Sequence, residues 1–321
     1  MKYRQLGNAG VRVSVIGLGT NRFGSDKVPQ KEVDSIVDAA EAAGVNHVDT
    51  ANRYTDGHAE EALGRALKGR WGRFVVASKF TMPVGSGPND RGASRYHMMN
   101  ALHGSLRRLQ TDHVDLYYVH RWDDQTPLEE TLRGLDDLVR AGKIRYIGVS
   151  AFASWQLARA SLLADVHRWA PVAVVQSEYN MLQREVEREV LPCCLAHDIG
   201  FVPYYPLAGG FLTGKYRRGQ SPPPGSRGES NESVRQYMES RYYDVTERLS
   251  DWARKRGRGL NELAQAWLLA RPAVCSVISG VTKLEQFQSN VKASDWELSE
   301  QEVQEIETIL EAEGSVQHQR S

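Results

Sequence analysis

The feature that most constrains the fold of this 321-residue chain is a β-type run followed by a helix-type segment, repeated about eight times. In segments such as 30–44 and 127–143, apolar side chains recur every three or four positions, which predicts helices. Parallel strands need a crossover between them, so this alternation predicts an α/β fold. Eight units favour a (β/α)8 TIM barrel, although an open doubly wound sheet fits the same pattern. The predicted strands cover residues 13–19, 45–50, 73–79, 113–120, 144–150, 172–178, 200–206 and 274–279.

Three segments lie outside the repeat. Residues 1–14 predict a β-hairpin, with GNAG as its turn, that closes the barrel floor. Residues 207–232 include the Pro-, Gly- and Ser-rich stretch RRGQSPPPGSRGES and predict a long functional loop. Residues 299–321 predict a C-terminal helix, with Ser299 and Glu302 as its capping box, and a frayed tail. No linker divides the chain, so we expect one domain over residues 1–321.

Charge and cysteine content exclude several classes of protein. Forty basic and forty acidic residues balance, which indicates no general affinity for nucleic acid or anionic membranes. No apolar run is long enough to cross a bilayer, and the N-terminus lacks an apolar signal core. Three cysteines fit neither a disulfide framework nor a zinc motif. We therefore expect a reduced, cytoplasmic protein without a metal site, and its oligomeric state stays open.

Ionisable side chains follow successive predicted strands. Asp49 ends the second and is followed by Tyr54, Lys79 ends the third, and His120 ends the fourth. In a barrel these ends meet at one mouth, where active sites lie. A lysine ammonium lowers the pKa of a nearby tyrosine, ordinarily about 10, and a carboxylate keeps that lysine charged. Lys79 would thus tune Tyr54 as an acid toward a carbonyl oxygen, which His120 would position.

Each of these residues also has an ordinary interpretation. Asp49 alone would be read as a turn or cap residue, and Tyr54 as a half-buried loop tyrosine. Other folds receive less support: GLG at 17–19 lacks the third glycine of a dinucleotide fingerprint. The sequence also contains no G-x-S-x-G elbow, so an open-sheet hydrolase is not supported.

Seven motifs, in order, resemble the aldo-keto reductase family from about residue 1 to residue 293. The likeness is greatest to bacterial members and to their relatives, the potassium-channel beta subunits. The motifs are VDTANRYTDGHAEEALGRAL (48–67), VVASKF (75–80), VDLYYVHRWD (114–123), IGVSAF (147–152), VQSEYNML (175–182), YYPLAGGFLTGKY (204–216) and SGVTKLEQFQSN (279–290).

The resemblance implies a (β/α)8 barrel that uses a nicotinamide cofactor, usually NADPH/NADP, to reduce a small-molecule aldehyde or ketone. It implies that Asp49, Tyr54, Lys79 and His120 are catalytic. It also implies that the nicotinamide amide binds Ser150 and Gln176 while its ring stacks on Tyr204. The implied cofactor-binding residues are Thr20, Asn21, Asp49, Ser150, Gln176, Tyr204, Pro206, Leu207, Gly209, Lys215, Arg227, Gly280, Thr282, Lys283, Gln286 and Asn290.

The chain departs from the family pattern at three places near the cofactor. Tyr205 replaces a serine, Ala151 stands where asparagine or arginine is common, and Asn21 with Arg22 replaces apolar or aromatic residues. The resemblance also leaves a second function open: an NADPH-binding sensor that regulates a partner, as the channel subunits do. The physiological substrate and the reaction direction cannot be read from these motifs.

Overall fold

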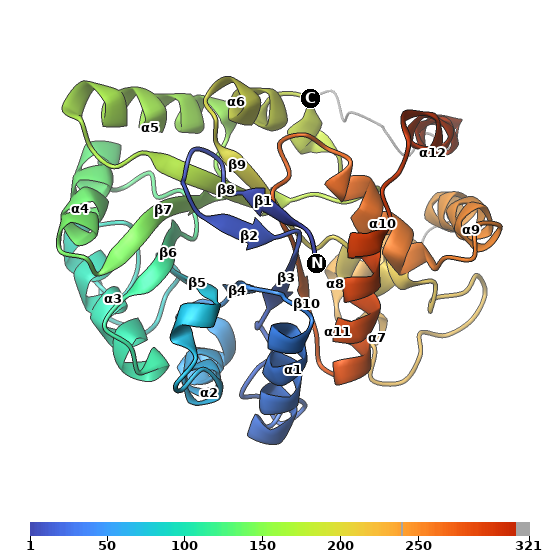
Figure 1. Cartoon of the computed structure of the whole chain (residues 1–321), viewed down its shortest axis with the longest axis horizontal. Coiled ribbons are helices and arrows are strands. Elements are labelled where there is room, and N and C mark those ends of the chain that lie inside the picture. Colours follow the sequence, from blue (N-terminus) through green and yellow to red (C-terminus); the bar gives the residue numbers. More distant parts are fainter. Residues whose placement is uncertain (239, 313–321) are drawn as a thin grey trace.

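A computed structural model describes residues 1–238 and 240–312. Eight parallel strands form one sheet in the order β10-β3-β4-β5-β6-β7-β8-β9, ringed by helices (Figure 1). The strands are β3 (Ile16–Gly19), β4 (His47–Asp49), β5 (Val75–Phe80), β6 (Val114–Val119), β7 (Ile144–Ser150), β8 (Val172–Glu178), β9 (Gly200–Tyr204) and β10 (Val277–Gly280). The helices are α1 (Gln30–Ala42), α2 (His58–Ala66), α3 (Arg95–Leu109), α4 (Leu128–Arg140), α5 (Ser154–His167), α6 (Val190–Ala196), α7 (Arg227–Ser230), α8 (Glu232–Arg235), α9 (Ser240–Arg254), α10 (Leu260–Leu269), α11 (Leu284–Val291) and α12 (Glu300–Ala312).

The two edge strands, β9 and β10, meet through residues just before β10. The Phe201 amide donates to the Ala273 carbonyl at 2.8 Å, and the Cys275 amide donates to the Phe201 carbonyl at 3.0 Å. Phe201 and Val274 form a parallel bridge between these bonds. The sheet therefore closes on itself, which confirms the predicted barrel and excludes the open sheet. All residues of β5 and β6 are buried, as expected for strands covered on both faces.

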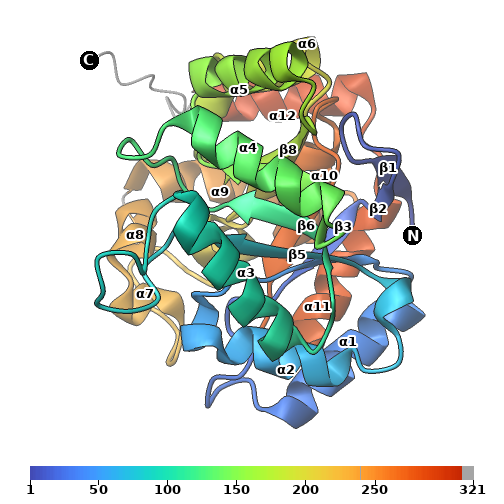
Figure 2. The same ribbon diagram turned by 90° about the vertical axis from the view of Figure 1, so that its left-hand side faces the viewer.

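An antiparallel hairpin, β1 (Tyr3–Gln5) and β2 (Arg12–Ser14), covers the N-terminal end of the barrel, as predicted. Figure 2 shows it at the opposite end of the strands from α7 and α8. The strand predicted over 13–19 is split, because residues 13 and 14 belong to the hairpin and only residues 16–19 to the barrel. Leu6, Ala9 and Val13 share a buried apolar cluster with barrel residues Val75, Ala77, Leu116, Ala173, Val174, Val202 and Ile278.

The predicted C-terminal helix is present as α12. The Glu302 amide donates to Ser299 Oγ at 3.2 Å, and the Ser299 amide donates to Glu302 Oε2 at 2.9 Å, which is the predicted capping box. The helix buries Ile306 and Leu310 against the barrel's outer layer. The tail predicted beyond it, residues 313–321, lies outside the described residues. Within the described part of the chain, no helix is long and apolar enough to cross a membrane.

The segment 207–232 is not wholly the loop that its composition predicts. A 3-10 turn covers Ala208–Thr213, and α7 begins at Arg227. The position of α7 is fixed by Tyr216. Its hydroxyl accepts a hydrogen bond from the Gly228 amide at 3.0 Å and holds α7 against the barrel. The Pro-rich part between them carries no regular element.

Gly7 should be irreplaceable at the barrel floor. Its φ is +55°, and a Cβ there would lie 2.1 Å from the Ala173 carbonyl oxygen and 2.3 Å from the Gly200 nitrogen. Gly7→Ala should therefore reduce the free energy of unfolding by roughly 2 to 4 kcal/mol, the scale of left-handed strain plus overpacking. Gly10→Ala is the control, because no atom lies within 4 Å of its Cβ position. Urea unfolding followed by tryptophan fluorescence measures the stability of both variants. Equal unfolding midpoints for the two would refute the role given to Gly7.

Candidate active site

The Lys79 ammonium is the centre of the candidate site and is fully buried. It lies 2.5 Å from Asp49 Oδ2 and donates to the Thr50 carbonyl at 2.9 Å and to Tyr54 Oη at 3.2 Å. The second oxygen of Asp49 accepts from Gln176 Nε2 at 2.9 Å. Strands β4, β5 and β8 are thus joined at their C-terminal ends by one network. Strand-end reasoning predicted that Asp49, Lys79 and Tyr54 would meet; it did not predict the contact between Gln176 and Asp49.

Tyr54 lies on a short 3-10 turn whose backbone departs from helical geometry. Thr55 and Asp56 have φ values of +46° and +55°, in the left-handed region that β-branched residues rarely adopt. The Thr55 hydroxyl donates to the Phe23 carbonyl at 2.7 Å. This bond ties the Tyr54 turn to the loop after β3, which carries the predicted cofactor residues. Strained backbone held by specific contacts is common at functional sites.

The pKa of Tyr54 is raised above its ordinary value, which corrects the expected net lowering. Burial of the phenol is the main cause, and the charge of Lys79 offsets it only in part. For Lys79, burial opposes the charged form, but Asp49 and Tyr54 outweigh it and raise the pKa. Tyr54 therefore keeps its proton at neutral pH, beside a charged lysine.

His120 faces Tyr54 across the mouth. The two ring centroids are 5.9 Å apart and the planes lie at 79°. Burial lowers the pKa of His120 to about 3, with smaller contributions from the charges of Lys79 and Arg121. The imidazole is therefore neutral at physiological pH. Its Nδ1 is buried and has no hydrogen-bond partner among the described residues.

Four predicted cofactor residues border this network. The Thr20 hydroxyl donates to the Asp49 carbonyl at 3.0 Å. Ser150 ends β7 opposite Gln176 in the parallel register, and both are buried. Asn21 follows Thr20, and its Oδ1 is buried without a partner in the described structure. The side chain of Gln176 is engaged by Asp49, although the sequence suggested only a contact with the cofactor.

The loop after β9 brings the next predicted group together. Tyr204 ends β9, and its ring lies 5.7 Å from that of Tyr205, edge to face. The Arg227 guanidinium lies 5.8 Å from the Tyr205 ring, so α7 returns to this loop. A Cβ on Gly210 would lie 3.0 Å from Lys215 Nζ, which places this ammonium over the loop. The 3-10 turn and its approach also contain Pro206, Leu207 and Gly209.

The last predicted group begins where β10 ends. A Cβ on Gly280 would lie 2.6 Å from Asn21 Oδ1, so a larger residue there would displace the Asn21 side chain. Thr282 donates to Gln286 Oε1 through its amide at 2.8 Å and its hydroxyl at 3.2 Å. Glycine at position 280 thus leaves the space that Asn21 occupies, and Thr282 and Gln286 contact each other.

An acidic side chain that the sequence did not reveal caps the start of α11. The Leu284 amide donates to Glu32 Oε1 of α1 at 2.8 Å, next to Lys283. Sequence reasoning considered only the residues of this segment and missed a carboxylate 252 positions away. At the helix end, Asn290 is buried and its Oδ1 accepts from Gln265 Nε2 at 3.2 Å. One backbone amide at the start of α11 therefore already has a hydrogen-bond partner within the protein.

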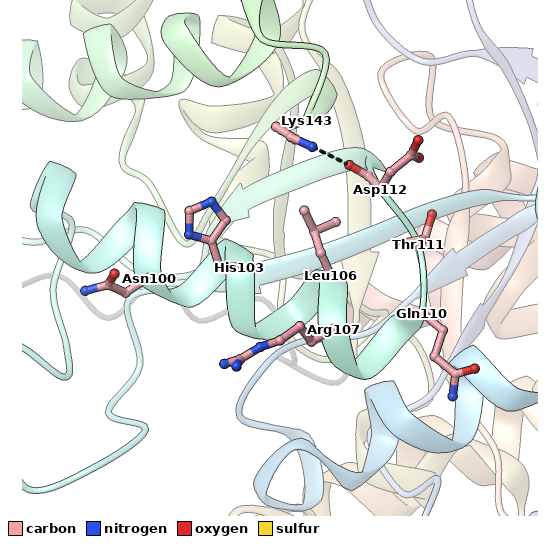
Figure 3. A pocket seen from close by; sticks show the side chains of 8 residues that line it. All are labelled: Asn100, His103, Leu106, Arg107, Gln110, Thr111, Asp112 and Lys143. Carbon is pink, nitrogen blue, oxygen red and sulfur yellow. Dashed lines mark hydrogen bonds between the residues drawn. The ribbon is translucent and has the colours of Figure 1, made fainter.

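An open groove elsewhere on the surface does not belong to this site. Figure 3 shows it between α3 and the segment that leads into β6, with Lys143 donating to the Asp112 carbonyl. Asp112 and Lys143 precede β6 and β7, so the groove lies toward the N-terminal ends of the strands. Its lining residues are Asn100, His103, Leu106, Arg107, Gln110, Thr111, Asp112 and Lys143. The described residues contain no cluster of His, Cys, Asp and Glu suited to a metal ion.

Comparison with known proteins identifies the family. The model of the aldo/keto reductase family matches residues 15–311. The chain belongs to the aldo/keto reductase family. It is 36% identical to a probable voltage-gated potassium channel subunit beta from Oryza sativa subsp. japonica, over 97% of each chain. It is 34% identical to the uncharacterized oxidoreductase YrpG of Bacillus subtilis (98% of this chain, 97% of YrpG) and 31% identical to L-glyceraldehyde 3-phosphate reductase of Escherichia coli O157:H7 (91% and 87%).

Beneath the network of Asp49 and Lys79 lies a buried histidine, His47. His47 precedes Asp49 by two positions on β4, so both side chains lie on the same face of the strand. Neither ring nitrogen of His47 has a partner among the described residues. Burial lowers its pKa to about 4, with smaller and opposing effects from Asp49 and Lys79. Sequence reasoning did not select His47, because it lies inside a strand instead of at its end.

The buried His47 should make stability fall in acid. Its pKa is about 4 when folded, against about 6.5 in an unfolded chain. The unfolded state thus binds more protons between these values, and the free energy of unfolding falls as pH drops from 6.5 to 4. The full effect is roughly 3 kcal/mol. His47→Gln should flatten the pH dependence in urea titrations, whereas exposed His103→Gln should not; parallel curves for parent and His47→Gln would disprove the role.

Proposed function

We propose that the chain is an NADPH-dependent reductase of aldehydes or ketones. The observation that carries this proposal is the buried Lys79 ammonium, which contacts both Asp49 and Tyr54 Oη. A phenol held by an ammonium and facing a neutral imidazole can protonate a carbonyl oxygen. The same arrangement has no nucleophile with an adjacent base, as hydrolysis through a covalent intermediate would need.

In this reaction, each residue of the site has a separate role at the carbonyl group. A reduced nicotinamide, when bound, supplies the hydride that goes to the carbonyl carbon. Tyr54 donates its proton to the oxygen, which leaves an alcohol. The Lys79 ammonium stabilises the phenolate that forms, and Asp49 holds that ammonium in place. His120, being neutral, donates a hydrogen bond to the carbonyl oxygen and orients it.

The residues around the mouth fit a nicotinamide dinucleotide. The buried Asn21 Oδ1 without a partner is an acceptor for an amide or hydroxyl donor. Gly280 is exposed and has no side chain to hinder an approaching cofactor. Lys215 and Arg227 lie over the rings of Tyr216 and Tyr205, Lys283 is exposed before α11, and all three cations suit phosphate groups. Ser150, Gln176 and Tyr204 would hold the nicotinamide end.

A regulatory role is the second candidate. It is favoured by the likeness to the rice protein named as a probable potassium channel subunit beta. The complete set of Asp49, Tyr54, Lys79 and His120 supports turnover instead. The relative named as an L-glyceraldehyde 3-phosphate reductase supports reduction of small aldehydes. Oxidation of NADPH by simple aldehydes, followed at 340 nm, separates the two: binding without turnover would favour the sensor.

Removing the phenol hydroxyl tests the proposed acid. Tyr54→Phe should lower kcat by a factor on the order of 10² or more, the usual scale for general acid catalysis. Lys79→Met should be as severe, because it also leaves Asp49 buried without its cation. Tyr96→Phe, on the exposed face of α3, is the matched control and should change little. NADPH affinity should stay near the parent value in Tyr54→Phe. Near-parent turnover in that variant would exclude Tyr54 as the acid.

Cofactor choice should depend on opposing charges near α11. The 2′-phosphate of NADPH carries nearly two negative charges, so Lys283 and Arg227 should favour NADPH over NADH at least tenfold, about 1.4 kcal/mol. Glu32 at the helix start opposes this. Lys283→Ala with Arg227→Ala should reduce the ratio of dissociation constants, and Glu32→Gln should increase it.

Titration of cofactor fluorescence at low and high salt measures these ratios, and the preference should shrink as salt rises. Glu311→Gln is the control, because that side chain is exposed on α12 and lies outside α11. Equal parent affinities for the two cofactors, or ratios that none of these substitutions changes, would show that these charges do not read the phosphate.

A further inference from the structure

Arg121 directly follows His120 at the mouth of the barrel. Its amide donates to Thr81 Oγ1 at 3.1 Å. Thr81 itself has a φ of +95°, a strained value for a β-branched residue, and is buried at the end of β5. The backbone of Arg121 is therefore fixed between the ends of β5 and β6. Its exposed side chain starts one residue from the imidazole that faces Tyr54.

The Arg121 guanidinium forms no ion pair with any carboxylate in the described structure. Burial lowers the pKa of His120 and raises the pKa of Tyr204, and the charge of Arg121 has a smaller, lowering effect on both. Both effects agree with the position of Arg121 at the end of β6, directly after His120. Arg140, on the outer helix α4, instead pairs with Asp136.

Other charged groups lie near Arg121 at the mouth. The carboxylate of Asp49 is paired with Lys79. Arg22 and Arg227 lie close enough for the charge of Arg22 to lower the pKa of Arg227, after burial, the main cause. Glu178, at the end of β8, is the acidic group near Tyr204, and burial raises its pKa. Because Arg227 would face the phosphates of the cofactor, Arg121 is the cation beside His120 that remains for a group on the substrate.

We propose that the substrates are small carbonyl compounds that carry a phosphate or carboxylate, and that Arg121 binds this anionic group. The inference rests on the proposed reductase function and extends it to a substrate class. A guanidinium offers paired donors that match the oxygens of either anion. With the carbonyl oxygen between Tyr54 and His120, a chain of a few atoms reaches the side chain beside His120. Arg121 is thus a specificity-determining residue, separate from the group that transfers the proton.

Two matched substrate pairs test the assignment. Glyceraldehyde and glyceraldehyde 3-phosphate differ by the phosphate, and butanal and 4-oxobutanoate differ by the carboxylate. For the parent, kcat/KM should be at least tenfold higher for the charged member of at least one pair, and the pair that shows it identifies the anion. Arg121→Gln should remove most of that preference through a higher KM. Its kcat/KM for the uncharged members should stay within twofold, because His120 is neutral with or without this charge.

Controls separate the possible failures. Arg107→Gln, exposed on α3 in the groove of Figure 3, should keep the parent preference. The NADPH dissociation constant should be unchanged in Arg121→Gln, which excludes an effect through the cofactor. Equal rates for charged and uncharged members in the parent, or a preference that survives in Arg121→Gln, would overturn the assignment while the reductase function stands. No reduction of any of the four aldehydes would overturn the reductase function and this inference with it.

Discussion

The ion pair between Asp49 and Lys79 is the interaction on which the rest of the site depends. Both groups are buried, so each would be costly without the other, and breaking such a pair typically costs 3 to 5 kcal/mol. Lys79 also satisfies its remaining donors with Thr50 and Tyr54, and Gln176 satisfies the second oxygen of Asp49. One ammonium therefore fixes the ends of three strands and the position of the phenol at the same time.

In the proposed reaction, the same ammonium would let Tyr54 stay protonated and still act as an acid. Burial raises the pKa of the phenol, and the nearby charge offsets only part of that rise. In the proposed reaction, the proton would stay on Tyr54 until an oxygen that gains negative charge comes within reach. Lys79 would then stabilise the phenolate more than the neutral phenol, so its effect would be largest as the proton leaves. Burial and the charge of Lys79 thus act in opposite directions on the pKa of Tyr54.

The strand ends were predictable because parallel strands in register place their C-terminal residues at one edge. That argument brought Asp49, Lys79 and His120 together from the sequence alone. Lateral contacts were not predictable, since they depend on barrel radius and rotamer: Gln176 reaches Asp49 across 127 positions, and Glu32 caps α11 from α1. The predicted direction of the pKa shift at Tyr54 was also wrong, because the spacing of residues in the sequence does not show how deeply the phenol is buried.

Backbone strain differs between the two ends of the barrel. Among the described non-glycine residues with positive φ, Gln110, Arg168 and Asp198 lie at or just after the C-terminal ends of helices, where this conformation is common. The other six all follow barrel strands at the mouth. Alanine and β-branched residues gain nothing locally from such a conformation, so surrounding contacts must impose it. The floor is instead closed by a hairpin whose tightest turn uses glycine. Strain is therefore concentrated where side chains must be aimed; the six residues are Thr55, Asp56, Thr81, Ala151, Tyr205 and Ala208.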